Sequence, residues 1–167
     1  QDSKTNKNII TINKNTGTSI QYYHGGAIYN NQTLTINNSL ITHCSAGYGG
    51  AITNNGQIII NNTLLDKNNA TDKNIMYDNG QTIFNDENGN CTIYNSHIKN
   101  TLTKATNIGE GAYMRYTGTI YNLGNPTIKR TIFDNITGVY PFYNQISGSF
   151  TIFNLGKFNA TYNYFIN

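Results

Sequence analysis

Short segments in which apolar and polar residues alternate recur along the chain at a regular spacing. The segment Gly25–Asn30 recurs 24 residues later as Gly49–Asn54, and Leu34–Leu40 recurs as Ile58–Leu64. Looser copies of the first segment begin later, at Thr82, Thr119 and Thr151. Because these segments alternate with a period of two and are rich in Ile, Thr, Tyr and Phe, we expect each to form a short strand.

The spacing of the copies predicts a chain that coils around one axis. Copies that begin at 27, 51, 82, 119 and 151 define about five coils, and Ile10–Asn13, which aligns with Leu34–Asn37, adds an N-terminal half coil. A repeat of this size with two or three short strands and no helix is typical of a parallel β-solenoid. The sequence therefore predicts an all-β fold, a parallel β-helix of three-sided coils, as a single domain over residues 1–167.

Coils stacked about 4.8 Å apart should place like residue on like residue in the interior. Three apolar columns in the aligned repeats satisfy this condition. The first column contains Ile28, Ile52, Ile83, Ile120 and Ile152. The second contains Ile36, Ile60, Ile93, Ile128 and Ala160, and the third contains Ile41, Leu65, Ile98, Phe133 and Phe165.

A column of asparagines follows the first apolar column. It contains Asn30, Asn54, Asn85, Asn122 and Asn154. Asn tolerates a left-handed backbone at a turn, and its amide is both donor and acceptor, so that stacked copies can bond along the axis. We interpret the column as a structural ladder rather than as a row of ligand-binding amides.

The composition argues against several classes of protein. Charged residues make up only 11% of the chain, with 11 basic and 8 acidic side chains, so no basic patch indicates nucleic acid as a partner. No apolar run approaches the roughly 18 residues of a membrane span. Good helix formers are scarce, whereas Asn, Thr and Gly, which are poor in helix interiors, are abundant.

Few residues indicate catalysis, and we expect no catalytic group, metal or cofactor. Asp66, Lys99 and Asp134 share one column on successive coils, an alternation of charge that we assign to the surface. The two carboxylates would lie about 9.6 Å apart, which an inverting glycosidase could use, so a polysaccharide lyase or hydrolase, or an inactive relative, is the alternative. Asp86–Asn90 lacks the spacing of a calcium-binding EF-hand loop and predicts a turn.

The cysteines and histidines do not gather in the aligned repeat. Cys44 and Cys91 fall at different positions of the coil, which predicts two free, buried thiols rather than a disulfide. His24, His43 and His97 fall in different columns, so they predict no metal cluster. His97 shares its column with apolar residues, and we expect it to be packed rather than to bind a ligand.

Aromatic residues offer the best candidate for a binding site. The column that should point outward contains Tyr29, Phe84, Tyr121 and Phe153, and the segments before it add Tyr77 and Tyr116. An exposed stripe of rings with polar edges suits a sugar face or a partner protein. Alternatively, the residues inserted in the later repeats fold back as an extra strand and cover these rings. The sequence leaves both arrangements open.

Seven Asn-x-Ser/Thr sequons are candidates for glycosylation, at Asn31, Asn37, Asn61, Asn69, Asn90, Asn135 and Asn159. They permit an extracellular, glycosylated protein, although many arise by chance in a chain so rich in Asn and Thr.

The pattern Gly-Gly-Ala-Ile-x-Asn followed by Leu-Thr-Ile-x-Asn-Ser, best seen at Gly25–Leu40 and Gly49–Leu64, resembles the repeats of adhesin-like surface proteins from methanogenic archaea. It is also similar to repeats of chlamydial polymorphic membrane proteins. The resemblance implies a right-handed, pectate-lyase-like parallel β-helix at the cell surface, and it implies no catalytic residues.

These observations together predict a non-enzymatic module, a rigid stalk or an adhesin-like domain displayed outside the cell. We expect it to be a fragment of a longer surface protein whose partner is a glycan or a surface protein on a host or neighbouring cell. Association of copies through the open ends of the stack, to form a structural fibre, is a further alternative.

Overall fold

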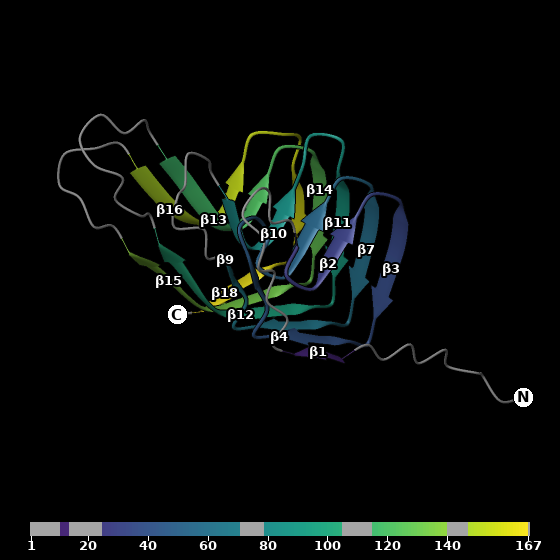
Figure 1. The fold of residues 1–167 in the computed structure, drawn as a ribbon, viewed down its shortest axis with the longest axis horizontal. Coiled ribbons are helices and arrows are strands. Elements are labelled where there is room, and N and C mark those ends of the chain that lie inside the picture. Colours follow the sequence, from purple (N-terminus) through teal and green to yellow (C-terminus); the bar gives the residue numbers. More distant parts are fainter. Residues whose placement is uncertain (1–10, 14–24, 71–78, 105–114, 140–146, 167) are drawn as a thin grey trace, which may run out of the picture.

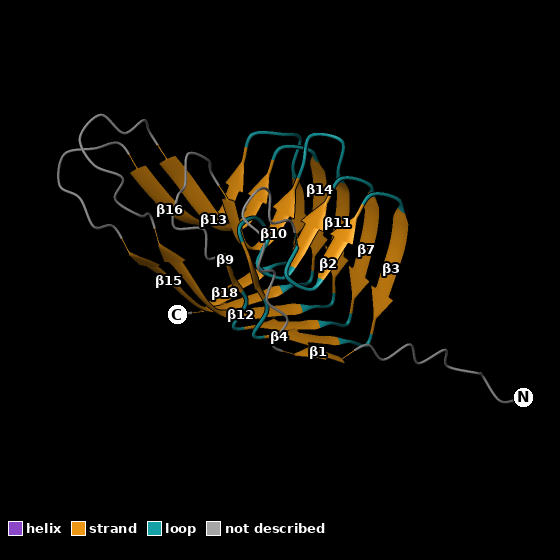
Figure 2. Ribbon diagram, viewed as in Figure 1, coloured by secondary structure: helices purple, strands orange, loops and turns teal. Residues whose placement is uncertain are grey.

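The computed structural model describes residues 11–13, 25–70, 79–104, 115–139 and 147–166. Every regular element in these ranges is a β-strand, and every strand pairing is parallel. The strands lie in three long stacked sheets and one short one (Figures 1 and 2). The chain is therefore an all-β parallel β-helix, as the repeat predicts. Its right-handed sense stays a prediction.

The three long sheets form the three sides of the coil. The β4 sheet contains β1 (Thr11–Asn13), β4 (Leu40–Thr42), β8 (Leu64–Asp66), β12 (His97–Lys104), β15 (Ile132–Val139) and β18 (Tyr164–Ile166). The β2 sheet contains β2 (Ile28–Asn30), β6 (Ile52–Asn54), β10 (Asn79–Asn85), β13 (Arg115–Asn122) and β16 (Ser147–Asn154). The β3 sheet contains β3 (Thr33–Asn37), β7 (Gln57–Asn61), β11 (Asn90–Tyr94), β14 (Asn125–Lys129) and β17 (Asn159–Thr161). β5 (Ser45–Ala46) and β9 (Asn69–Ala70) form the short fourth sheet.

One strand from each long sheet makes a coil. Coil one contains β2, β3 and β4, coil two contains β6, β7 and β8, and coils three to five follow in the same order. β1 precedes coil one, so the described strands make five coils and one leading strand. The number of coils agrees with the prediction from the repeat.

The three apolar columns fill the interior in the predicted register. Ile28, Ile52, Ile83, Ile120 and Ile152 are paired in sequence along the β2 sheet. The columns that begin at Ile36 and Ile41 are paired in the same way along the β3 and β4 sheets. Most of these side chains are fully buried and form one core cluster. Each buried Ile contributes about 1.5–3 kcal/mol relative to an exposed side chain.

The N-terminal half coil has a different register from the predicted one. The alignment places Ile12 below Ile36, but the structure pairs β1 with β4, so that Ile12 lies beside Ile41. A strand that alternates Ile with polar residues fits any of the three interior columns, because all three bury aliphatic side chains. The repeat alone could not assign this strand to a sheet.

The Asn column forms the predicted ladder. The side-chain amide Nδ2 of each Asn donates to Oδ1 of the next, from Asn30 to Asn54 and from Asn54 to Asn85, both at 2.7 Å, then from Asn85 to Asn122 at 2.6 Å and from Asn122 to Asn154 at 2.7 Å. The first four side chains are buried. Each amide also donates to a backbone carbonyl in the turn that follows it, as Asn85 does to Gly89 at 2.9 Å. The ladder therefore joins neighbouring coils and closes the turn within each coil.

The left-handed backbone is not at the ladder residues, where we expect it from the sequence, but at the other two corners of the coil. The corner after the β3 sheet has positive φ at Asn38, Asn62, Asn95, Arg130 and Tyr162, with values of 48° to 56°. The corner after β4 and β8 has positive φ at His43 and Lys67, and the equivalent residues Asn100 and Asn135, also with positive φ, lie inside the longer strands β12 and β15. Ladder residues instead end an extended strand, where an amide side chain can reach its own turn.

The repeated Gly-Gly pair has a backbone requirement. Gly25 and Gly49 have φ of 60° and 56°. A Cβ atom at either residue would collide with the backbone carbonyl three residues later, Ile28 or Ile52. Only glycine meets both conditions, which explains why the pair opens the closest copies of the repeat.

Within the described part of the chain, the buried hydroxyl of Thr119 lacks the hydrogen-bond partner that the equivalent hydroxyl of Thr82 has. In coil three, Thr82 Oγ1 lies 3.1 Å from Thr101 Oγ1. Thr119 precedes the core Ile of coil four as Thr82 does in coil three, and Ile136 occupies the register position of Thr101. Thr119 is fully buried, and among the described residues its Oγ1 has no hydrogen-bond partner.

We predict that Asn85→Ala lowers the free energy of unfolding by about 2–4 kcal/mol, because it leaves several buried donors and acceptors unpaired. Asn55→Ala is the control. Asn55 lies in an outer amide row, where it donates to exposed Asn31 at 3.2 Å. This change should cost no more than about 0.5 kcal/mol. Urea unfolding measures both values, and equal losses would contradict the structural role of the buried ladder.

We also predict opposite effects from one substitution at two equivalent positions. Thr119→Val removes an unsatisfied buried hydroxyl and should raise the free energy of unfolding by about 1 kcal/mol. Thr82→Val leaves the Thr101 hydroxyl without its partner and should lower it by about 1–2 kcal/mol. Thermal and urea unfolding of the two variants test this, and a change of the same sign in both would show the prediction to be wrong.

Candidate binding surfaces

The aromatic column is mostly covered. Phe84 and Tyr121 are only 8% and 3% exposed, Phe153 is half-buried, and Tyr29 is 53% exposed. The rings stack along the axis, with centroids 5.7 Å apart for Phe84 and Tyr121 and 4.8 Å apart for Tyr121 and Phe153. Tyr48 packs edge-on against Phe84 at 5.4 Å. Phe84 and Tyr121 are thus buried, and the described ring contacts are with each other, with Phe153 and with Tyr48. Whether the inserted residues form the extra strand that would cover the rings stays a prediction, since most of them lie outside the described residues.

These contacts change the predicted binding face. Phe84 and Tyr121 cannot present a ring face to a ligand, because their stacked neighbours and the surrounding chain exclude solvent. Tyr29 keeps an exposed ring at the β2 end of the column. The predicted site residues Tyr77 and Tyr116 have side chains outside the described part of the structure. The column acts as a packing element, and a continuous aromatic stripe is not available on this side.

The charged column has the predicted register and lies on the β4 sheet. Lys99 is paired with Asp66 on one side and with Asp134 on the other. Asp66 accepts a hydrogen bond from Asn100 Nδ2 at 2.7 Å, and the Asp134 carboxylate lies 3.3 Å from His97 Nε2. Each carboxylate thus has a polar neighbour from a coil beside it.

The remaining residues that could carry chemistry lie apart. In the described ranges, no three His, Cys, Asp or Glu side chains come close enough to hold a metal ion. Asp86 accepts backbone N–H bonds from Glu87 and Gly89, both at 2.8 Å, in the turn between β10 and β11. The sequence prediction of a turn is confirmed here.

Both cysteines are free thiols in the interior, as their unaligned positions predict. Burial raises the pKa of the Cys91 thiol to about 12, because the apolar surroundings disfavour the thiolate. Cys44 Sγ donates to the Thr42 carbonyl at 3.4 Å. Cys91 therefore stays protonated at neutral pH and is a poor nucleophile.

The predicted glycosylation sites differ in accessibility. Asn31, Asn90, Asn135 and Asn159 are exposed, whereas Asn37, Asn61 and Asn69 are half-buried. In the second group the sequon hydroxyls of Ser39 and Thr63 are buried and donate to the carbonyl of their own Asn, at 2.7 and 3.0 Å. An enzyme that needs the hydroxyl could reach these two sequons only before the chain folds.

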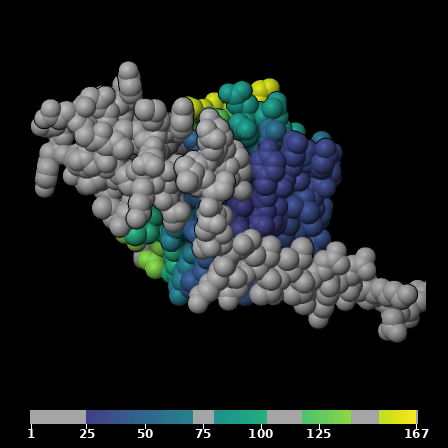
Figure 3. Space-filling model, in the orientation of Figure 1, coloured from purple at the N-terminus to yellow at the C-terminus, as the bar shows by residue number. Residues whose placement is uncertain are grey.

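A groove runs along the corner between the β3 and β4 sheets. It has a volume of about 300 Å³ and is lined by Asn38, Ser39, Asn62, Thr63, Leu64, Asn95 and His97, from coils one to three. The three Asn side chains come from the left-handed corner positions, which turn them out of the core. Asn62 Nδ2 donates to Asn38 Oδ1 at 2.7 Å, and Asn95 Nδ2 donates to Asn61 Oδ1 at 3.1 Å. In Figure 3 the first two coils, coloured purple to blue, form one continuous surface.

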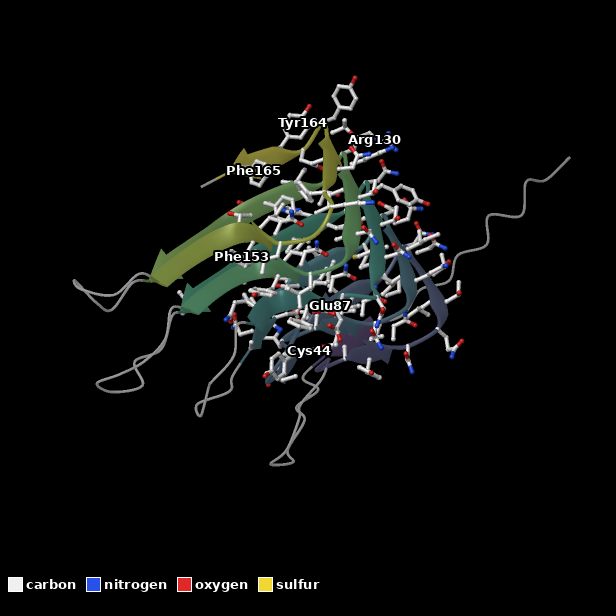
Figure 4. All side chains as sticks on the ribbon, turned by 90° about the horizontal axis from the view of Figure 1, so that it is seen from above. Cys44, Glu87, Arg130, Phe153, Tyr164 and Phe165 are labelled. Carbon is white, nitrogen blue, oxygen red and sulfur yellow. The ribbon has the colours of Figure 1, made fainter. Side chains whose placement is uncertain are left out.

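The row of corner residues continues beyond the groove. Arg130 and Tyr162 occupy the same corner on coils four and five, and Arg130 Nε donates to Asn95 Oδ1 at 2.7 Å. Tyr164 continues the column of His97. Tyr162 and Tyr164 are 80% and 64% exposed. Figure 4 shows Arg130 and Tyr164 near the same end of the stack.

Sequence reasoning missed this corner. A signal was present, because Asn38, Asn62 and Asn95 align in the repeat as closely as the ladder residues do. Their difference from the ladder is the direction of the side chain. That direction depends on whether the corner residue has a positive φ, which the period of the repeat does not determine.

The coil-five end of the stack exposes residues that continue the core. Phe165 lies in register with Phe133 and stacks on it with a centroid distance of 5.1 Å, yet it is 62% exposed. Ala160 and Phe158 are also exposed there. At the opposite end, Ile36 and Ile41 are fully buried. The two ends of the described stack therefore differ in apolar exposure.

No helix in the described part of the chain is long and apolar enough to cross a membrane. Comparisons of the chain with family models, with curated proteins and with solved structures give no match.

Proposed function

We propose that the chain is a non-enzymatic, adhesin-like module of an extracellular surface, in which a stiff solenoid presents a binding face. The observation that carries the proposal is the buried ladder from Asn30 to Asn154, which bonds all five coils along the axis. Because each coil is held to its neighbours by this ladder and by three paired strands, the stack resists bending and stretching.

The character of the surface supports an extracellular site. Outer rows of Asn pair from coil to coil, as in the bonds from Asn55 to Asn31 and from Asn135 to Asn100. Four of the predicted sequons are exposed. An amide-rich surface with few charges that can carry glycans suits a partner such as a glycan or a protein on another cell.

We predict that the chain binds at least one class of cell-surface glycan displayed on a glycan array and releases no product from it. Chromatography of the same glycans after incubation with the chain measures cleavage. Asp66→Asn and Asp134→Asn remove the two carboxylates that a hydrolase would use. Product formation that disappears in either variant would replace the adhesive role with an enzymatic one.

Association through the coil-five end is a second candidate, which the exposed core residues Phe165, Ala160 and Phe158 favour. The strands at this end, β16, β17 and β18, are the outermost of their sheets and have one unpaired edge. At the opposite end β2 and β3 are also outermost strands, but Ile36 and Ile41 are buried there, which favours a meeting of like ends. Like ends that meet form a closed dimer, whereas unlike ends would continue the sheets into a fibre.

We predict that light scattering coupled to size-exclusion chromatography detects a dimer whose population rises with concentration. Phe165→Glu places a charge in the apolar end and should shift the equilibrium to monomer. Leu102→Glu, at an exposed position of β12, is the matched control and should leave the dimer intact. A mass that keeps growing with concentration would instead indicate a fibre, and a monomer throughout would exclude association.

A further inference from the structure

We infer that the corner groove along Asn38, Asn62 and Asn95 binds an extended, neutral oligosaccharide with its chain parallel to the solenoid axis. The inference rests on the proposed adhesive function and names its site and its class of ligand. Three properties of the groove carry it. These are the free bonding capacity of its amides, its mixed polar and apolar walls, and its repeat along the axis.

The amide row can bind sugar hydroxyls without losing its own contacts. A primary amide has two N–H donors and an oxygen with two lone pairs. The bond to Asn38 uses one donor of Asn62, which leaves its second N–H and its acceptor oxygen for a ligand. Asn38 accepts that bond through Oδ1, and its two N–H groups make no hydrogen bond within the described residues. Sugar hydroxyls both donate and accept, and amides complement both roles.

The opposite wall of the groove offers an aliphatic side chain and an imidazole ring. Leu64 and His97 line it, and they belong to a column on the β4 sheet that continues through Ile132 to Tyr164. A pyranose ring has C–H groups on its faces and hydroxyls at its edges. A ring placed in the groove can therefore pack one face on Leu64 and His97 while its edge meets the amides. At coil five the exposed ring of Tyr164 extends this wall.

The axial repeat selects an extended chain of sugars. Corner residues on successive coils are about 4.8 Å apart, which is close to the length of one pyranose unit in an extended β-linked glycan. Successive sugars can thus lie beside equivalent Asn residues on one wall, with Leu64 and His97 of coils two and three on the other. Coils one to three supply three such positions, Asn38, Asn62 and Asn95.

The charge of the groove favours a neutral ligand. None of the seven lining residues is Asp, Glu, Lys or Arg. His97 lies beside the Asp134 carboxylate, and Arg130, the nearest cation of the corner row, already donates through Nε to Asn95. Neither sign of charge therefore dominates the groove, and an acidic sugar gains no matching row of cations.

The test is isothermal titration of the whole chain with β-1,4-linked gluco-oligosaccharides of two to five units, and with oligogalacturonates of the same lengths. We expect the affinity for the neutral series to rise up to three or four units and then to level off. Asn62→Gly removes the central amide, and glycine accepts the positive φ at this corner. It should weaken binding about tenfold, the effect of losing one or two hydrogen bonds.

Two further variants keep the test decisive. Asn55→Gly makes the same change in an outer amide row away from the groove, and it should leave the affinity unchanged. Asn38→Gly removes the first amide of the corner row and should also weaken binding. It leaves the buried ladder from Asn30 to Asn154 intact. Thermal unfolding of each variant establishes that it is folded at the temperature of the titration.

The outcomes separate the inference from the function on which it rests. Equal loss in Asn62→Gly and Asn55→Gly, tighter binding of the acidic series, or no binding of the neutral series would overturn the groove assignment. Binding of other glycans on the array would still uphold the adhesive role in each case. Cleavage of the neutral oligosaccharides during the titration would contradict the non-enzymatic function itself.

Discussion

The buried amide ladder is the interaction on which the structure depends, because it links all five described coils in a single register. Aliphatic columns tolerate a shift, since one Ile packs on another as well as on its own counterpart. An amide in the core tolerates none, because a displaced Asn85 would leave its donors and those of Asn54 unpaired. The ladder thus converts a general preference for stacking into one alignment of five coils.

From this alignment follows the arrangement of the surface. Once the coils are in register, every position outside the core also becomes a row along the axis, whether or not the row is buried. The left-handed corner turns Asn38, Asn62 and Asn95 outward, and the next column supplies Leu64 and His97 as a second wall. A groove with regular chemistry is then a consequence of the same stacking that stabilises the core. A stiff frame and a repeating surface groove are two results of one constraint.

The places where sequence reasoning fell short have physical causes that can be named. Ile12 was assigned to the wrong sheet because all three interior columns accept an aliphatic residue. The sequence predicts left-handed backbone at the ladder residues because Asn is common both at left-handed corner positions and at the ends of strands. The residue type alone does not distinguish these two positions. The orphaned hydroxyl of Thr119 became visible only when the pairing of Thr101 with Ile136 was known.

The sequence by itself determined the parallel coil, the number of coils, the three core columns and the partners in the Asn ladder, because a stack of like on like repeats the same residue at each turn. Only the tertiary structure decided which faces are open. Phe84 and Tyr121 are covered, while the corner of Asn62 and the ring of Tyr164 are accessible. The accessibility of a side chain depends on the φ of the corner residues and on which segments of the chain pack over each sheet. The period of the repeat determines neither of these.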